Sequence, residues 1–321
     1  MTKAVTRRNT LAAVAGTAMS ASCRRKPQPG KEPRVSILRA GNYSQDLYEK
    51  VRRVVAEHAP AVRGKRVVIK PNLVEFDPGT SINTNPLLVH AAYEAFLALG
   101  AAEVRIAEGP GHRRPTWDLA EAAGYFSAVP GFEDRFTDLN LDEVDRVKLG
   151  RHESRLHSLY LPRTVLGCDL LVSMPKMKTH HWVGATLSMK NLFGVVPGGV
   201  YGWPKNVLHW AGISECIVDL HATFPRLFAI VDGIEGMEGN GPIQGKPKSA
   251  GVIVAGTDFA AVDSTCCRIM GIDPEKVAYL KMAAREGQTV AENVRQAGEQ
   301  IASVRTDFVL MPEFSSIRLG S

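Results

Sequence analysis

Short apolar runs rich in β-branched residues alternate along the chain with segments in which apolar residues recur at helical spacing. The apolar runs predict strands at residues 35–38, 66–70, 103–107, 168–173, 227–232 and 252–255. The periodic segments predict helices at residues 45–56, 85–99, 116–123, 207–223, 259–270 and 274–285. This alternation predicts an α/β protein with a doubly wound, mostly parallel sheet that carries helices on both faces.

One segment departs from this alternation. Residues 136–139, 146–149 and 156–161 have the pattern of short strands, and a polar turn at 150–154 separates the last two. We therefore expect a small antiparallel insert around 136–161.

The composition is that of a globular protein, with 45% hydrophobic and 22% charged residues and no apolar run long enough to span a membrane. Residues 24–34 contain three prolines and a glycine, which is typical of a flexible tether. We expect residues 1–33 to be a leader with this tether, and residues 34–321 to form one α/β domain.

The net charge of +6 is located almost entirely in the leader. Residues 1–34 carry eight Lys and Arg against one Glu, whereas the rest of the chain carries 31 basic and 32 acidic residues. A nucleic-acid-binding protein needs its positive charge on the folded domain, where it can neutralise phosphates. The distribution therefore excludes nucleic acid as a partner.

The leader resembles a twin-arginine export signal. Arg7 and Arg8 precede a weakly apolar stretch at 11–19 and three basic residues at 24–26. The resemblance implies the twin-arginine export machinery as a partner and an exported protein, periplasmic or anchored on the outer side of the cytoplasmic membrane. Cys23 ends a segment similar to a lipobox, but Ser20 stands where Leu is usual, so lipid attachment stays open. The alternative is an ordinary basic N-terminus.

The cysteines are few after the leader, and no C-x-x-C pair is present. The ligand count therefore excludes a zinc ribbon and an iron–sulfur module. Cys266 and Cys267 are adjacent within a predicted helix, where burial as small apolar side chains is favoured over redox chemistry.

Polar side chains gather where the predicted strands end. Lys, His, carboxylate and glycine residues combine at 70–72, 108–114, 175–181 and 232–242. Ligands of open α/β sheets bind beyond the carboxyl ends of the strands, so these loops predict a ligand cleft. We expect His112, His180, Lys190 and Asp232 to line it. The residues predicted to bind a cofactor or small anion are Lys70, Asn72, Arg113, Lys176, Lys178, Asn191, Asp232 and Asn240.

Three lysines in one segment differ in their expected surroundings. Lys176 and Lys178 are predicted at a strand end within reach of water, either simply solvated or holding a carboxylate or phosphate together. Lys190 lies in an apolar turn, where desolvation lowers the pKa of an amine and favours nucleophilic chemistry.

Several motifs lie at or near these predicted strand ends: residues 175–180 (PKMKTH), 186–194 (TLSMKNLFG), 197–198 (PG), 231–242 and 254–258. Together they resemble the family called domain of unknown function 362, over about residues 66–272. The family name supplies no reaction. Some of its members carry added iron–sulfur modules, for which this chain has no motif.

A more distant resemblance concerns nickel-pincer lactate racemases. Residues 111–116 (GHRRPT) are similar to the Gly-x-His-Arg-x-x-Thr loop of those enzymes, with one position of difference. His180 is followed ten residues later by Lys190 and then by Pro-Gly at 197–198, as in the racemases.

This resemblance implies roles for four residues. His112 and His180 correspond to the proton-transfer pair, Lys190 to the lysine that holds the pincer nucleotide, and His209 to the nickel ligand at a slightly longer spacing. The racemases have a second, substrate-shaping domain that has no counterpart here, and the 136–161 insert has no counterpart in them.

Two functions follow as hypotheses. The first is an enzyme that performs cofactor- or metal-dependent proton or hydride chemistry on a small organic acid, in the manner of a racemase or epimerase. The second is an exported binding protein that holds an anionic ligand or a metal in the same cleft without turnover.

Overall fold

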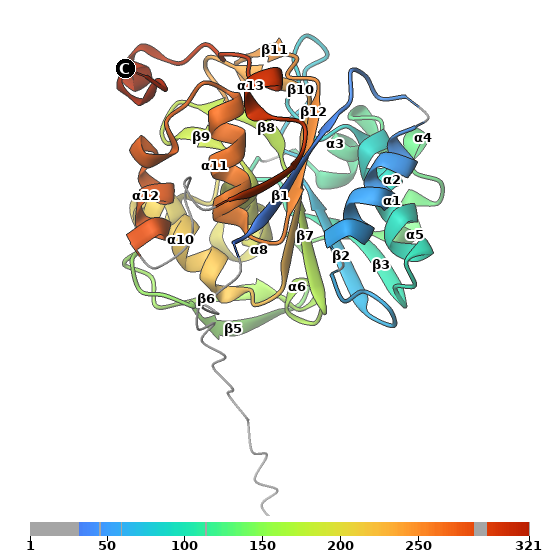
Figure 1. Ribbon diagram of the computed structural model, residues 1–321. Coiled ribbons are helices and arrows are strands. Elements are labelled where there is room, and N and C mark those ends of the chain that lie inside the picture. The colour runs from blue at the N-terminus through green and yellow to red at the C-terminus, as the bar shows by residue number, and fades with distance from the viewer. Residues whose placement is uncertain (1–31, 45, 59, 113, 286–293, 321) are drawn as a thin grey trace, which may run out of the picture.

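The computed structural model describes residues 32–44, 46–58, 60–112, 114–285 and 294–320. Its main sheet has the strand order β13-β1-β12-β10-β7-β2-β3-β4 (Figure 1). The strands are β1 Arg34–Arg39, β2 Arg66–Pro71, β3 Glu103–Glu108, β4 Phe136–Asp138, β7 Leu170–Met174, β10 Leu227–Glu238, β12 Val252–Gly256 and β13 Arg295–Gly298. The run β10-β7-β2-β3-β4 is parallel, while β12 is antiparallel to both β10 and β1. The predicted mostly parallel α/β fold is confirmed.

Helices cover both faces of this sheet, which explains why β7 and β12 are buried along their whole length. One face carries α1 Leu47–His58, α2 Pro86–Ala98, α3 Thr116–Ala122, α4 Tyr125–Ala128 and α5 Phe132–Arg135. The other carries α7 Ser188–Asn191, α10 Ile213–Thr223, α11 Phe259–Ile269 and α12 Ala278–Arg285. Figure 1 shows the two groups on opposite sides of the strands. Each face has its own apolar core.

Shorter helical turns connect these elements. They are α6 Arg163–Leu166, α8 Gly198–Tyr201, α9 Asn206–Trp210, α13 Ile301–Val304 and the 3-10 turns η1 Leu192–Val195, η2 Pro274–Lys276 and η3 Pro312–Ile317. No helix in the described ranges is long and apolar enough to cross a membrane.

The local signals in the sequence account for α2. The side chain of Asn85 accepts a hydrogen bond from the Leu87 N–H, and Pro86 occupies the first helical position, where its missing N–H costs nothing. Gly100 follows the helix with a φ of 90°, a conformation that glycine adopts without steric cost.

The antiparallel insert is smaller than predicted. Only β5 Val144–Lys148 and β6 Ser158–Pro162 form the antiparallel pair. Residues 136–139 were expected to belong to it, but β4 joins the main sheet parallel to β3. The reason is burial, because Phe136 stacks on Phe132 with 4.8 Å between ring centroids and lies under Trp117 at 5.2 Å.

The helix predicted at 207–223 is two helices, α9 and α10. Gly212 separates them with a φ of 106°, a backbone conformation that a continuous helix does not contain. Likewise, the segment predicted as a helix at 274–285 begins as the 3-10 turn η2 before α12.

Two predicted strand-end loops are themselves strands. The structure continues β10 to Glu238, past the predicted end at Asp232, and residues of the 175–181 loop form β8 Lys176–His180. These strands pair with each other, and β9 Gly184–Thr186 and β11 Lys246–Lys248 extend the sheet further. This extension brings β8 to the ligand cleft.

Cys266 and Cys267 are fully buried in α11, and burial raises the pKa of both thiols. They pack as small apolar side chains, as predicted.

Candidate functional site

A cavity of about 460 Å³ opens beyond the carboxyl ends of β2 and β3, between their loops and the segments that follow β8. Many of the residues predicted from the sequence line it: Lys70, Asn72, His112, Lys178, His180, Lys190, Asn191, His209 and Asn240. The position agrees with the rule that open α/β sheets bind ligands at this edge. Arg113, also predicted, lies outside the described residues.

Lys176 and Asp232 are not part of this cavity, contrary to the prediction. The two side chains form a buried ion pair at 2.7 Å. The carboxylate of Asp232 also accepts hydrogen bonds from the Tyr43 hydroxyl at 2.9 Å and the Asn85 N–H at 3.0 Å. Because β10 continues beyond Asp232, this residue lies within a strand and not in an open loop. Its role in the fold is to neutralise Lys176.

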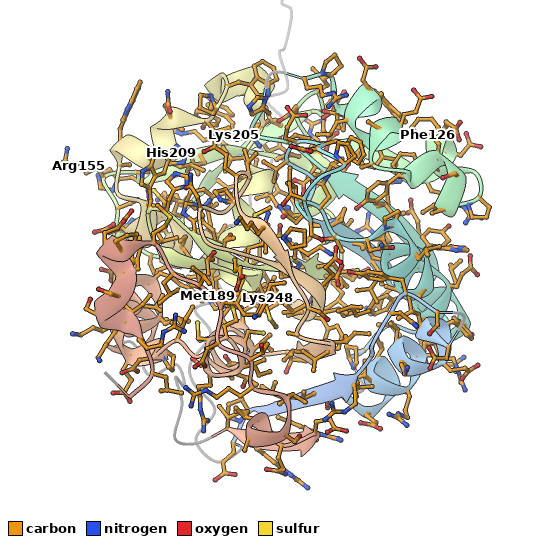
Figure 2. The ribbon with its side chains drawn as sticks, turned by 90° about the horizontal axis from the view of Figure 1, so that it is seen from above. Phe126, Arg155, Met189, Lys205, His209 and Lys248 are labelled. Atoms are coloured by element: carbon orange, nitrogen blue, oxygen red, sulfur yellow. The ribbon has the colours of Figure 1, made fainter. Side chains whose placement is uncertain are left out.

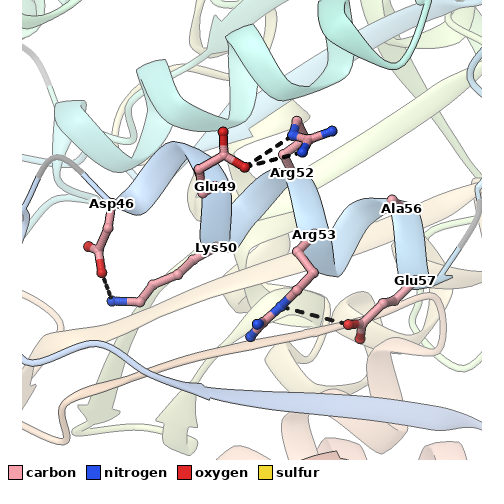
Figure 3. Close-up of a pocket in the computed structure, with 7 residues that line it drawn as sticks. All are labelled: Asp46, Glu49, Lys50, Arg52, Arg53, Ala56 and Glu57. Atoms are coloured by element: carbon pink, nitrogen blue, oxygen red, sulfur yellow. Dashed lines mark hydrogen bonds and ion pairs between the residues drawn. The ribbon is translucent and has the colours of Figure 1, made fainter.

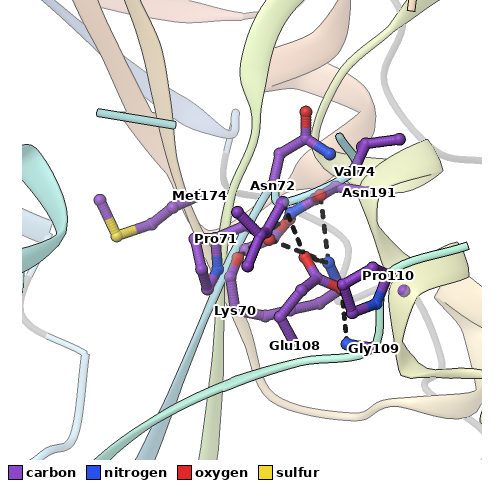
Figure 4. A network of polar contacts seen from close by, with 12 residues as sticks. Lys70, Pro71, Asn72, Val74, Glu108, Gly109, Pro110, Met174 and Asn191 are labelled. Atoms are coloured by element: carbon purple, nitrogen blue, oxygen red, sulfur yellow. Dashed lines mark hydrogen bonds and ion pairs between the residues drawn. The ribbon is translucent and has the colours of Figure 1, made fainter. Parts of the chain in front are cut away.

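A second buried ion pair lies at the base of the cavity (Figure 4). Lys70 Nζ is 2.7 Å from Glu108 Oε2 and also donates to the Pro71 carbonyl at 3.0 Å and to Asn191 Oδ1 at 3.1 Å. Both charged side chains are at most 2% exposed. Burial lowers the pKa of Lys70, and the adjacent Glu108 opposes that shift. The three acceptors match the three protons of the ammonium group.

Gly194 allows the chain to pass directly over this pair. A Cβ atom at this position would lie 2.0 Å from Glu108 Oε1 and 2.5 Å from Lys70 Nζ. The glycine of the TLSMKNLFG motif is therefore required for close approach, because any side chain would collide with the ion pair.

Two further lysines bring positive charge without a carboxylate. Lys178, 1% exposed, donates to Asn72 Oδ1 at 2.6 Å and to the carbonyls of Ile82 at 2.9 Å and Pro242 at 3.2 Å. Burial lowers its pKa well below the usual value, while its three neutral acceptors suit an ammonium ion. Lys176 and Lys178 are 2% and 1% exposed, so the expectation that both lie within reach of water is wrong.

Lys205 is the second of these lysines, and sequence reasoning missed it. Its Nζ donates to the Gly109 carbonyl, and burial lowers its pKa to about 7. Figure 2 shows it close to His209, from the same short helical segment. The one feature of the sequence that could have indicated Lys205 as a site residue is its position after Trp203 and Pro204, shortly beyond the Pro-Gly motif.

Lys190 differs from the other lysines of the cavity. Its Nζ lies 3.7 Å from the centroid of the Phe193 ring, and the described part of the chain offers it no hydrogen bond or ion pair. Desolvation, followed by the charges of Lys70 and Lys205, lowers its pKa to about 7. This direction agrees with the prediction made from its apolar turn.

A buried carboxylate holds the turn that carries Lys190. Asp263 of α11 accepts hydrogen bonds from the Ser188 N–H at 2.8 Å, the Met189 N–H at 3.1 Å and the Ser188 hydroxyl. It is fully buried, and burial raises its pKa to about 7. These contacts fix the start of α7 relative to the core.

Two of the histidines that line the cavity, His180 and His209, have lowered pKa values. His180 is 4% exposed and its Nδ1 accepts from the Trp182 N–H at 3.0 Å, so a neutral ring carries its proton on Nε2. Burial, then Lys190, lowers its pKa well below the usual value. Burial and Lys190 also lower the pKa of His209 to about 4, although the backbone of Lys205 opposes this. Both imidazoles are therefore neutral at pH 7.

Trp182 lines the same wall and is 58% exposed. Its ring lies edge-on to His181 at 4.5 Å and to His209 at 5.2 Å between centroids. His112 lies at the mouth and is half exposed, 3.1 Å from Glu75. Glu75, Glu108 and Trp182 were not predicted as site residues. A carboxylate that ends a strand, as Glu108 does, was the clearest missed signal.

A metal site built from protein ligands alone is not found. The described ranges contain no group of three or more His, Cys, Asp and Glu residues arranged to hold a metal ion. His209 supplies one imidazole, whose buried Nδ1 has no hydrogen bond of good geometry.

A second hollow, of about 670 Å³, lies over the outer face of α1 (Figure 3). Its charged side chains pair with each other at helical spacing, as in Lys50–Asp46, Arg52–Glu49 and Arg53–Glu57. This is a solvated helix surface with its charges already matched, and we assign no site to it.

The fold and the cavity define an α/β protein with a lysine- and histidine-rich cavity at the carboxyl edge of a mostly parallel sheet. The chain belongs to the family described as domain of unknown function (DUF362), whose family model matches residues 67–268.

Among curated proteins, the chain is similar to the thylakoid-associated protein sll1697 of Synechocystis sp., with 27% identity over 266 residues, or 78% of each chain. Among solved structures, it is similar to the lactate racemase apoprotein from Thermoanaerobacterium thermosaccharolyticum, with a TM-score of 0.42, 14% identity, and coverage of 74% of this chain and 57% of that one. A protein from Thermotoga maritima gives a TM-score of 0.37 and 15% identity over 71% of this chain and 59% of that one. The chain thus spans less than two thirds of either solved protein.

Proposed function

We propose that this protein is an enzyme that binds a small organic anion in the cleft and moves a proton to or from it, as a racemase or epimerase does. One observation carries the proposal: Lys190 brings an amine without a hydrogen-bond or ion-pair partner among the described residues into the cavity, with a pKa of about 7. Near neutral pH such an amine is present in both forms, so it can act as a base or a nucleophile. His112 and His180 line the same cavity and supply imidazoles.

The charge of the cavity supports an anionic ligand. Lys178 and Lys205 are buried and donate to neutral oxygens, and the carboxylate of Glu108 is already paired with Lys70. Burial without a counter-ion disfavours the charged form of both lysines and lowers their pKa, and an anion that enters would stabilise that charged form. The same lysines favour the second candidate, a non-catalytic binding protein for an anion, because binding alone does not need the unpartnered amine of Lys190.

The residues present also fit the cofactor that the racemase resemblance implies. Lys190 offers an accessible amine for covalent attachment, and His209 offers a neutral imidazole with an unsatisfied nitrogen. A nickel-pincer nucleotide would supply a hydride acceptor when bound. Lys178 and Lys205 would neutralise its negative charge, and His180 would hold or release a proton through Nε2.

The test is the interconversion of D- and L-lactate and of the enantiomers of related 2-hydroxy acids, followed by chiral chromatography, with protein purified from its native host and its nickel content and intact mass measured. Lys190→Met should abolish interconversion and still bind the anion, whereas Lys178→Met should weaken anion binding. A parent protein that binds these acids without interconverting them, and a Lys190→Met variant that binds them equally well, would establish the non-catalytic alternative.

We also propose that the protein is exported by the twin-arginine route and is periplasmic or membrane-anchored, with lipid on Cys23 as one form of anchor. These residues lie outside the described part of the chain, so the proposal rests on the sequence around Arg7 and Arg8. Replacing both arginines with lysine should retain the protein in the cytoplasm. Export of that variant at the parent level would refute the assignment.

A further inference from the structure

The loop that follows β2 presents Glu75 in a defined position beside His112, which lines the cavity. Asn83 bridges this loop: its Oδ1 accepts from the Val74 N–H at 2.9 Å, and its Nδ2 donates to the Glu75 carbonyl at 2.8 Å. The backbone on both sides of the Val74–Glu75 peptide is therefore tied to one side chain. An otherwise irregular loop gains a fixed conformation at Glu75.

The carboxylate of Glu75 contacts two residues of the loop that follows β3. Its Oε2 lies 3.1 Å from His112 Nδ1, and its Oε1 accepts from Arg114 Nη1 at 2.7 Å. Burial acts to raise the pKa of Glu75, but hydrogen bonds from the Phe76 N–H and Arg114 outweigh it, so the pKa is lowered. Glu75 is thus an ionised acceptor in the physiological range.

We propose that Glu75 is a positioning residue that fixes the tautomer and orientation of His112. An ionised carboxylate accepts hydrogen bonds and cannot donate them, so the nitrogen that faces it, Nδ1, must carry the proton. In the neutral ring the lone pair is then on Nε2, which is the nitrogen left for a ligand in the cavity that His112 lines. The inference rests on the proposed function, because it gives the state in which His112 would accept a proton.

This arrangement is complementary to that of His180. There the Trp182 N–H donates to Nδ1, so the lone pair of the neutral ring is on Nδ1 and its proton is on Nε2. Of the histidines that line the cavity, His112 and His180 are therefore held in opposite tautomers, one with a free acceptor and one with a free donor. This is the arrangement that a proton donor and a proton acceptor require at the start of one turnover.

A purely structural role for Glu75 predicts something different. If the carboxylate only ties the two loops together through Arg114, the tautomer of His112 should not depend on Glu75 more than on Arg114. Arg114→Gln removes that tie and leaves the carboxylate facing His112, so it is the matched control.

The experiment is nitrogen NMR of the full chain labelled with ¹⁵N-histidine, at a pH where the ring of His112 is neutral, with His112→Gln used to assign its signals. The parent should show the proton on Nδ1. Glu75→Ala should lose this signature and give a mixture of tautomers, Glu75→Gln should retain it in part because an amide oxygen can still accept, and Arg114→Gln should leave it unchanged.

Three results would overturn the proposal: a parent ring with its proton on Nε2, an unchanged tautomer in Glu75→Ala, or an equal change in Arg114→Gln. If Glu75→Ala does not fold, the parent and the two glutamine variants still decide. The measurement uses no ligand, so it is independent of whether the protein turns over a 2-hydroxy acid. The interconversion of the enantiomers of 2-hydroxy acids tests the proposed function by itself.

Discussion

Removing the charge of Glu108 is the most informative perturbation of the cavity base. In the parent, the Leu73 N–H donates to Glu108 Oε2 at 3.2 Å and the Gly109 N–H donates to Oε1 at 2.9 Å, so the single amide oxygen of Glu108→Gln can accept from only one of them. The larger loss is the negative charge 2.7 Å from Lys70, in a place where both side chains are at most 2% exposed. The variant therefore leaves a buried ammonium ion without its counter-charge.

The expected loss follows from the burial of the pair. Breaking a fully buried ion pair by removing one partner costs about 3–5 kcal/mol, because the remaining charge is desolvated without compensation. This corresponds to a change of roughly 150- to 4,000-fold in the folding equilibrium. Adding Lys70→Met removes the orphaned charge as well, so the double variant should recover most of the lost stability.

The assay is denaturant unfolding of the parent, both single variants and the double variant, read as a double-mutant cycle. Asp46→Asn, at the exposed residue directly before α1, is the control, since it breaks a solvated pair with Lys50 and should leave the free energy of unfolding unchanged within error. A loss below about 1 kcal/mol in Glu108→Gln, or a double variant no more stable than the single one, would refute the reasoning.

Three further predictions concern the same cavity. Gly194→Ala should destabilise the protein and disrupt the Lys70–Glu108 pair, because the Cβ atom of the alanine would lie 2.0 Å from Glu108 Oε1. A melting temperature of the variant equal to that of the parent would contradict this. Lys190 should react with an amine-selective reagent with a midpoint near pH 7, measured by peptide mass spectrometry, and a midpoint near 10.5 would show that its ammonium is solvated. Folding lowers the pKa of Lys205 from 10.5 to about 7, so the unfolded chain binds more protons than the folded chain between these two pH values. The free energy of unfolding should therefore rise with pH across that window, by at most about 1.4 kcal/mol per pH unit. Lys205→Met should reduce this slope, and an equal slope in the variant would exclude the assignment.

Much of the architecture could be predicted from the sequence, because hydrophobic periodicity depends on residues close together in the chain. The apolar runs became strands, Asn85 and Pro86 began α2, and the loops after β2 and β3 became walls of the cavity. The apolar turn around Lys190 gave the direction of its pKa shift before any contact was known. Each of these depends on local pattern or on a general rule of α/β sheets.

The errors arose where burial decided between two acceptable local structures. The segment that begins at Phe136 suits either an insert strand or an edge strand of the main sheet, and its stacking on Phe132 selected the latter. Gly212 divides a segment with helical periodicity, because the chain turns there with a φ of 106°. In neither case does the spacing of apolar residues along the chain distinguish the two local structures.

The sequence by itself determined which chemical groups this edge of the sheet would hold, and the tertiary structure decided which of them are already neutralised and which are available to a ligand. Asp232 and Lys176, 56 residues apart, cancel each other, and so do Lys70 and Glu108, 38 residues apart. Lys190 has no hydrogen-bond or ion-pair partner in the described ranges, so its amine remains available within the cavity. The state of a charged side chain depends on what lies within a few ångströms of it and on its access to water, and both are set by contacts between segments distant in the chain.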